Sequence, residues 1–265
     1  MSAGTALVTG ASSGIGAAVA AALVRRGYTV YGTSRDPEKV NDPVEGVTYL
    51  ALDLSDDASI EACAAAAGPV DVLVNNAGES QSGPFEELPM DALRRLFQIN
   101  VLGAVRLSQL VLPGMRERRR GRVVMVGSML ASFPLAYRSS YVASKAAVKG
   151  FAHAARREYA GYGVGITTVE PGSIATGISE RRTQYVAEGS PFRAAYDTML
   201  AALNANEARG ITAAKVAATV LAAIEAPRPR PLYAVGSNAP LVFALRRVLT
   251  RGAVERMVAR RHGLR

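Results

Sequence analysis

The sequence of 265 residues is poor in the residue types that build disulfide frameworks and metal sites. It has one cysteine, Cys63, two histidines, His153 and His262, and no tryptophan. One cysteine excludes an intramolecular disulfide framework and a cysteine-based zinc site, and two histidines exclude a histidine-rich metal site. The sequence therefore predicts no bound metal.

The sequence also lacks recognisable targeting segments. The first residues show no basic region followed by the apolar run of a signal peptide. No window approaches the roughly 18 uninterrupted apolar residues of a membrane span. Apolar residues nevertheless make up 49% of the chain, enough to bury a core and to exclude disorder. We expect a folded cytoplasmic protein.

The formal net charge is +9, which raises nucleic acid or an anionic membrane as partners. The excess is concentrated at the end of the chain. Residues 226–265 hold nine arginines and a single carboxylate, Glu255, so they carry eight of the nine excess charges. The first 225 residues are close to neutral, and we expect no nucleic-acid partner.

Residues 239–265 form a basic tail with a helical pattern. Its apolar stripe consists of Leu241, Val242, Leu245, Val248 and Leu249, with arginines between them. A basic amphipathic helix can lie weakly on an anionic membrane surface. It can also pack on its own domain or on a partner subunit. The second interpretation is favoured because many surface helices share this pattern.

The rest of the chain alternates short apolar runs with longer helical patterns. Such alternation is typical of a doubly wound α/β fold with a parallel sheet, here a single Rossmann-type domain over residues 1–238. About seven strands are expected, at 6–9, 28–33, 47–52, 70–74, 122–126, 165–169 and 232–235. Helices are expected at 17–26, 55–67, 90–118 (interrupted or ended near Pro113), 140–160 and 212–226.

Residues 176–210 break this alternation with a mixture of apolar and arginine residues. An insertion of this length before the last strand favours a lid over the substrate. The alternative is a pair of surface helices.

A glycine-rich turn follows the first strand directly and opens the first helix. In this position glycines let the backbone approach a pyrophosphate, and the helix N-terminus offers N–H groups and a positive dipole end to the anion. The turn therefore predicts a dinucleotide site. Its cofactor-binding candidates are Gly10, Ser12, Ser13, Gly14, Ile15 and Gly16.

The second strand should end beside the adenosine ribose, where NAD-binding proteins usually place a carboxylate. This chain has Ser34 and Arg35 there, followed by Asp36. A guanidinium can bind a 2′-phosphate through paired charge-assisted hydrogen bonds. We therefore expect NADP(H); the alternative is a solvated Arg-Asp turn without cofactor preference.

Further motifs follow the glycine-rich turn along the chain. They are Asn75-Asn76-Ala77-Gly78, Asn100, Ser128, the YxxxK motif from Tyr141 to Lys145, and Pro171-Gly172. Together with the glycine spacing TGxxxGxG, these motifs resemble the short-chain dehydrogenase/reductase family over residues 5 to about 236. The segment around Gly127-Ser128 and residues 100–106 is similar to its steroid- and retinol-dehydrogenase-like branch.

Tyr141 and Lys145 are four residues apart, so they project from one face of a helix. A free tyrosine hydroxyl is a weak acid, and a nearby ammonium favours the phenolate, which suits the hydroxyl to acid–base work near neutral pH. Tyr141 is therefore the expected general acid/base. Ser128 would polarise a carbonyl oxygen. The resemblance implies that Lys145 also binds the nicotinamide ribose and that Asn100 holds a water of a proton relay; alternatively, Asn100 is a structural residue that binds neighbouring backbone.

The resemblance implies further cofactor contacts along the chain. For Asp53 the alternative is a cap on the helix that begins after Ser55, and for Thr176 a cap on a lid helix. The residues that match family positions are Asp53, Leu54, Asn76, Ala77, Gly78, Pro171, Gly172, Ile174 and Thr176, in addition to Tyr141 and Lys145.

The expected function is hydride transfer between NADPH and a carbonyl/alcohol pair. The residues after Ser128 (Met129, Leu130, Phe133 and Leu135) are apolar and favour a lipophilic ketone or aldehyde. Two alternatives stay open: a non-catalytic NADPH-binding regulator or scaffold, and a sugar-nucleotide epimerase or dehydratase. The resemblance also implies a homodimer or homotetramer.

Overall fold

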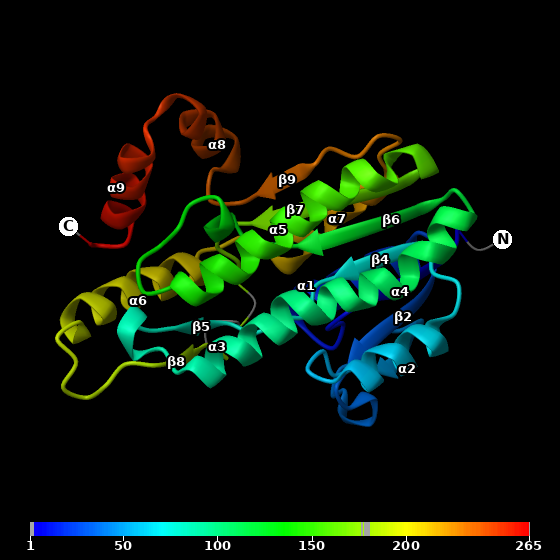
Figure 1. The fold of residues 1–265 in the computed structure, drawn as a ribbon, viewed down its shortest axis with the longest axis horizontal. Helices are drawn as coiled ribbons and strands as arrows, with labels where there is room; N and C mark the ends of the chain where they lie inside the picture. Colours follow the sequence, from blue (N-terminus) through cyan, green and yellow to red (C-terminus); the bar gives the residue numbers. More distant parts are fainter. Residues whose placement is uncertain (1–2, 176, 178–180, 265) are drawn as a thin grey trace.

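The structure is a computed structural model that describes residues 3–175, 177 and 181–264. Its centre is a parallel sheet of seven strands in the order β3-β2-β1-β4-β6-β7-β9 (Figure 1). The order reverses between β1 and β4, and in such sheets ligands bind outside the carboxyl ends of the strands at the reversal. The strands are β1 (Thr5–Val8), β2 (Thr29–Ser34), β3 (Val47–Ala51), β4 (Val72–Asn75), β6 (Gly121–Val126), β7 (Val164–Pro171) and β9 (Leu232–Val235).

Helices cover both faces of the sheet, which confirms the doubly wound fold. On one face, α1 (Gly14–Arg25) and α7 (Ala213–Glu225) enclose a core of valine and alanine with β1, β4 and β6. On the other face lie α2 (Asp57–Ala67), α4 (Gly103–Glu117) and α5 (Ser139–Tyr159), over a second core. The central strands β1, β4 and β6 are nearly continuous apolar runs because both of their faces are buried.

The long helix expected over 90–118 is divided, but not at Pro113. It consists of α3 (Met90–Phe97), a π-helical segment Gln98–Leu102 and α4, which continues through Pro113 to Glu117. Leu107 and Met115 are fully buried on either side of the proline, and their packing offsets its lost hydrogen bond. The π segment instead marks the position of Asn100.

By length and composition, residues Met90–Glu117 could cross a membrane. In this fold, 56% of their most apolar window is buried, mainly against the sheet and neighbouring helices. The apolar character of this helical stretch is therefore accounted for by its place in the second core.

Beyond the carboxyl ends of the strands lies a group of elements that we call the covering region, residues 181–208 and 239–264. It contains β8 (Thr183–Gln184), α6 (Arg193–Ala208), α8 (Ala239–Val248) and α9 (Arg251–Arg261). β8 pairs with β5 (Gln81–Ser82) in a second, two-stranded parallel sheet. Two-residue strands have no readable periodicity, so the sequence did not predict this sheet. Short 3₁₀ turns complete the chain at Pro37–Lys39, Phe85–Glu87, Met129–Ala131 and Ala160–Tyr162.

The covering region has its own apolar core, separate from the two cores on the sheet. Tyr196 and Met199 of α6 are completely buried there, beside Val254 and Val258 of α9. Phe133, which follows β6, joins this core and meets Phe243 of α8 edge to face at 5.0 Å. In Figure 1 these elements gather at one end of the sheet, far from the N-terminus.

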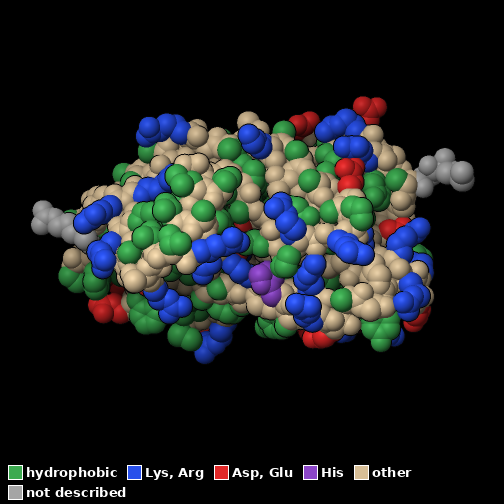
Figure 2. All heavy atoms as spheres, turned by 90° about the horizontal axis from the view of Figure 1, so that it is seen from above, with side chains coloured by type: hydrophobic (Ala, Val, Ile, Leu, Met, Phe, Trp, Pro, Cys, Tyr) green, Lys and Arg blue, Asp and Glu red, His purple; other side chains and the backbone are tan. Residues whose placement is uncertain are grey.

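The basic tail is two helices rather than one continuous stripe. Thr250 caps α9, because its hydroxyl accepts a hydrogen bond from the Ala253 N–H at 3.4 Å. α9 packs into the third core, whereas Leu241 and Val248 of α8 remain exposed. The predicted apolar stripe 241–249 is therefore only partly buried. Figure 2 shows hydrophobic and basic side chains intermixed over the surface that α8 and α9 form.

Candidate active site

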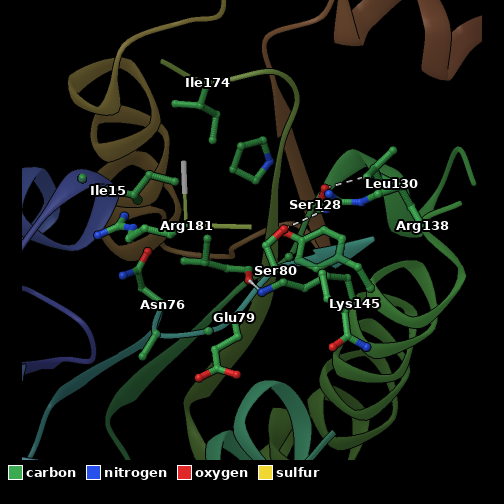
Figure 3. Close-up of a pocket in the computed structure, with 18 of the residues that line it drawn as sticks. Ile15, Asn76, Glu79, Ser80, Ser128, Leu130, Arg138, Lys145, Ile174 and Arg181 are labelled. Carbon is green, nitrogen blue, oxygen red and sulfur yellow. Dashed lines mark hydrogen bonds between the residues drawn. The ribbon is translucent and has the colours of Figure 1, made fainter. Parts of the chain in front are cut away.

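A cleft of about 780 Å³ runs along the carboxyl edge of the sheet, between the strand ends and the covering region (Figure 3). Most of the predicted site residues line it, although they come from seven separate segments. Those in its wall are Gly10, Ser12, Ser13, Gly14, Ile15, Ser34, Arg35, Asp53, Leu54, Asn76, Ala77, Gly78, Ser128, Tyr141, Lys145, Pro171, Gly172 and Ile174.

The glycine-rich turn enters the cleft with the conformation that glycine allows. Gly10 and Gly14 have positive φ angles of 67° and 57°. Ser13, which precedes α1, makes no side-chain cap, and the first turn of α1 carries no acidic residue. The turn therefore offers its N–H groups to an anion, which fits a pyrophosphate.

Gly16 is not in the cleft wall, contrary to its prediction as a contact residue. A Cβ at Gly16 would lie 2.1 Å from the carbonyl oxygen of Gly10. The absence of a side chain at Gly16 thus lets α1 pack closely against the glycine-rich turn. Gly16 supports the conformation of the turn but does not line the cleft.

Thr9 and Asn76 hold the turn against the end of β4. The Thr9 hydroxyl accepts hydrogen bonds from the N–H groups of Asn76 and Ala77, both at 2.9 Å. The Asn76 amide donates to the Thr9 carbonyl at 2.9 Å and to the Gly10 carbonyl at 3.3 Å. Asn76 therefore fixes the shape of the cradle as well as lining it.

At the end of β2, Arg35 is exposed and lines the cleft. Asp36, the carboxylate that follows Arg35, forms an ion pair with Lys39 at 2.6 Å and is absent from the cleft wall that the structure describes. The Ser34 hydroxyl donates to the Asp36 carbonyl at 3.1 Å. The cation, rather than the carboxylate, is thus presented at this end of the cleft.

Asp53 lines the cleft and does not cap α2. Its carboxylate accepts hydrogen bonds from the Ser55 N–H at 2.8 Å and the Ser55 hydroxyl at 2.6 Å, which together lower its pKa. The cap of α2 is Asp56, whose carboxylate accepts from the Ala58 N–H at 3.0 Å. α2 accordingly begins at Asp57, two residues after the predicted start.

Tyr141 and Lys145 lie on the first turns of α5 and are both buried. The Lys145 ammonium donates to the Val126 carbonyl at the end of β6 at 3.0 Å and lies 5.8 Å from the centre of the Tyr141 ring. Ser128 follows β6 and accepts a hydrogen bond from the Leu130 N–H at 3.2 Å. In Figure 3, Ser128 and Lys145 lie around the same part of the cleft.

Asn100 is buried and does not line the cleft. Its amide oxygen accepts from the Glu79 N–H at 2.7 Å, and its amide nitrogen donates to the Glu79 carbonyl at 3.0 Å and to the Ser144 hydroxyl at 3.2 Å. It therefore ties the chain after β4 to α5, which is the structural role left open above. Thr176 lies outside the described residues.

Arg138 is a cleft residue that the sequence analysis missed. It precedes α5, is 2% exposed, and its guanidinium lies 4.5 Å from the centre of the Tyr141 ring. Among the described residues, it donates one hydrogen bond, to the Ser80 hydroxyl at 3.0 Å. A cation three residues before the tyrosine is visible in the sequence, but nothing in a local pattern shows that it is buried.

Two further residues of the cleft wall come from the covering region. Arg181 lines the cleft, and its guanidinium donates to the Ser13 hydroxyl of the glycine-rich turn at 3.1 Å. His262, at the end of α9, also lines it. The basic tail therefore packs on its own domain, the interpretation favoured above, and also forms part of the cleft wall, which the sequence did not predict.

The family model described as short chain dehydrogenase matches residues 4–186. The chain belongs to the short-chain dehydrogenase family. Human retinol dehydrogenase 8 is 37% identical over 185 residues, which cover 65% of this chain but only 59% of that protein. Family membership confirms the resemblance drawn from the glycine, YxxxK and Pro-Gly motifs.

Solved structures agree over nearly the whole chain. A short-chain dehydrogenase from Streptomyces avermitilis is 36% identical, covers 93% of each chain and superposes with a TM-score of 0.82. A short-chain dehydrogenase from Burkholderia cenocepacia J2315, solved in complex with NADP, is 26% identical with a TM-score of 0.78 and covers 97% of this chain and 98% of its own. At this coverage, the similarities reach into the covering region.

Proposed function

We propose that this chain is an NADP(H)-dependent oxidoreductase that interconverts a lipophilic ketone or aldehyde and its alcohol. One observation carries the proposal. Ser128, Tyr141 and Lys145 lie in the wall of the same cleft as an uncapped glycine-rich helix start. One end of this cleft can hold a dinucleotide, and the other carries acid–base groups.

The chain's residues fit the cofactor as follows. The turn from Gly10 to Gly14 would receive the pyrophosphate, with Arg181 able to reach it from the covering region, and Arg35 would bind the 2′-phosphate. When bound, NADPH supplies the hydride. Lys145 would hold the nicotinamide ribose, as the family resemblance implies. The Burkholderia relative with bound NADP supports this choice of cofactor.

Tyr141 would act as the general acid. In reduction, the carbonyl carbon gains a hydride while the oxygen takes the proton of the Tyr141 hydroxyl. Ser128 would hydrogen-bond that oxygen and stabilise its developing negative charge. Lys145 would favour the phenolate that remains, and Asn100 would position the chain around Lys145. In alcohol oxidation each of these proton movements is reversed.

The substrate end of the cleft supports a lipophilic molecule. Its wall is built by apolar residues that come from four separate parts of the chain, beside the polar side chains of Arg138, Glu207 and His262. The apolar residues are Met129, Leu130, Phe133, Leu203, Val242, Met257 and Val258. Mostly apolar pockets with a few placed polar groups suit such ligands. Retinol dehydrogenase 8, by its name, acts on a molecule of this kind.

The decisive experiment uses the Tyr141→Phe variant and an NADPH-consumption assay against ketones, aldehydes and quinones. Removing the phenolic proton should lower turnover by at least about a hundredfold, because general acid catalysis supplies about 10²–10⁴-fold. NADPH binding, followed by fluorescence, should be unchanged. Full turnover in this variant would refute the role of Tyr141, and failure of the wild type to bind NADPH would refute the cofactor.

The remaining expectations are proposals as well. Residues 176–210 would act as a lid, the protein would be cytoplasmic, and it would assemble as a homodimer or homotetramer. The exposed part of α8 leaves weak contact with an anionic membrane as a second role for the tail.

A further inference from the structure

Arg138 carries a feature that hydride transfer as described above does not explain. Its Nε and Nη1 atoms are buried, and among the described residues they have no hydrogen-bond partner. Burial, with a smaller contribution from nearby Arg182, lowers the pKa of Arg138 to about 10, so the guanidinium stays charged at neutral pH. A buried, incompletely paired cation costs stability, and such groups are usually kept for a reason other than folding.

Three carboxylates of this region each pair with another cation, and the charge of Glu207 only partly offsets the lowering of the Arg138 pKa by burial. Glu207 of α6 accepts two hydrogen bonds from Arg182, both at 2.7 Å. Glu170 of β7 pairs with Lys149 at 3.0 Å. Glu79, before β5, pairs with Arg95 of α3 at 2.6 Å. The cations Arg138 and Lys145 lie 4.5 Å and 5.8 Å from the centre of the Tyr141 ring.

The chain holds Arg138 over this ring through several contacts. The Ser80 hydroxyl accepts its hydrogen bond beside β5 (Figure 3). The preceding residue, Tyr137, has a φ of +62°, a conformation that is rare for a residue with a large side chain. Its ring packs edge to face on Tyr196 at 5.9 Å. The backbone turn that delivers Arg138 is thus fixed by the core of the covering region.

We propose that Arg138 is a positioning residue for Tyr141, a second cation beside Lys145 that stabilises the phenolate form of the tyrosine. This proposal rests on the proposed function and deepens it. A cation over an aromatic face is attracted to the ring, more strongly in a desolvated site and more strongly still when the ring bears a negative charge. The Arg138 Nε and Nη1 atoms then lack hydrogen-bond partners in the described part of the chain because the guanidinium is held next to the reacting group rather than where it could be fully paired.

The test compares Arg138→Met with the wild type. Methionine fills a similar volume without charge, and Arg94→Met is the matched control, since Arg94 is exposed and pairs with Asp91 away from the cleft. Alcohol oxidation is measured against pH. Loss of the cation should move the acidic limb of the profile upward by about one pH unit, a tenfold loss of rate on that limb. Arg138→Lys, which restores a charge, should recover part of the shift.

A second readout does not depend on turnover. The ultraviolet absorbance of tyrosinate is titrated in the wild type and in Tyr141→Phe, and the difference isolates Tyr141. The same absorbance difference is then measured between Arg138→Met and the double variant Arg138→Met with Tyr141→Phe. The transition should move upward with the pH limb, and the thermal midpoint should not fall, because a poorly satisfied buried charge is removed. If Arg138→Met does not fold, Arg138→Gln, which can still donate to Ser80, replaces it.

Three results would overturn the proposal. An unmoved tyrosinate transition would show that Arg138 does not act on Tyr141. A lower thermal midpoint with an unmoved limb would make Arg138 a structural residue. A rise in KM confined to substrates that carry a carboxylate, again with an unmoved limb, would make it an anion-binding residue. If the wild type reduces no carbonyl compound, the proposed function fails, while the absorbance titration still decides the role of Arg138.

Discussion

The sheet with its flanking helices and the covering region build the two ends of one cleft in different ways. The sheet end is made by short motifs at successive strand ends, each positioned by the strand before it. The covering region assembles its core from residues 129–135, 186–203 and 239–264. Its parts are separated by long stretches of chain and meet only in the folded protein.

This difference assigns different tasks to the two regions. The sheet end presents backbone groups, fixed by close packing of Gly16 on Gly10 and by the Thr9 and Asn76 hydrogen bonds. The covering region presents apolar side chains and Arg181, His262 and Glu207. A ligand common to the family fits the first kind of surface, and a substrate particular to this protein fits the second.

The largest expected effect on cofactor binding is at the sheet end, in Gly16→Ala. The added Cβ would meet the Gly10 carbonyl oxygen at 2.1 Å, and backbone must shift to admit it. Such overpacking costs about 1–3 kcal/mol. Because the shift distorts the turn that would receive the pyrophosphate, NADPH binding should weaken by about ten- to a hundredfold, as measured by fluorescence titration. The control is Gly150→Ala in α5, where nothing lies within 4 Å of the added Cβ. Equal affinities in the two variants would refute the close-packing argument.

The next effect separates the two regions directly. Met199→Ala in α6 and Leu23→Ala in α1 both empty fully buried sites, at a cost of about 2–5 kcal/mol each. As urea is raised, Met199→Ala should lose carbonyl reduction before it loses NADPH binding, because the covering region opens first. Leu23→Ala should lose both together. Simultaneous loss in Met199→Ala would show that the two regions unfold as one unit.

A smaller effect concerns the cation at the end of β2. Arg35→Asp should lower the ratio of NADPH to NADH affinity by at least about tenfold, since a charge-assisted pair to the 2′-phosphate contributes about 1.5–3 kcal/mol. Arg25→Asp, at the exposed end of α1, changes the net charge equally and should leave the ratio unchanged. An unchanged ratio of NADPH to NADH affinity in Arg35→Asp would refute the proposal that Arg35 binds the 2′-phosphate.

The smallest effect is a pH dependence of stability in the covering region. Burial lowers the pKa of His262 below 6.5, so the folded state disfavours the protonated ring. As the pH falls through about 6.5, the unfolded state takes up the proton first, and the free energy of unfolding decreases. Thermal midpoints should therefore fall between about pH 7 and about pH 5.5, less so in His262→Gln. Part of the fall should persist because burial also lowers the pKa of His153. If the thermal midpoints of the wild type and of His262→Gln depend on pH in the same way, His262 does not cause the loss of stability.

The sequence predicted most of what the sheet contributes. Apolar runs placed the seven strands, and the glycine, YxxxK and Pro-Gly motifs placed nearly all of the residues that line the cofactor end of the cleft. The misses have local reasons. Pro113 looked like a helix end because propensity ignores the burial of Leu107 and Met115. Gly16 looked like a contact residue because its motif does not show that it packs on Gly10.

By itself, the sequence determined the fold class, the glycine cradle and the spacing of Tyr141 and Lys145, because each depends on residues close together in the chain. Only the tertiary structure decided that the basic tail walls the cleft, that Asn100 binds the Glu79 backbone, and that Arg138 lies buried over Tyr141. These depend on which distant segments pack together, and burial turns an ordinary arginine into a charge that must be accommodated beside the reacting group.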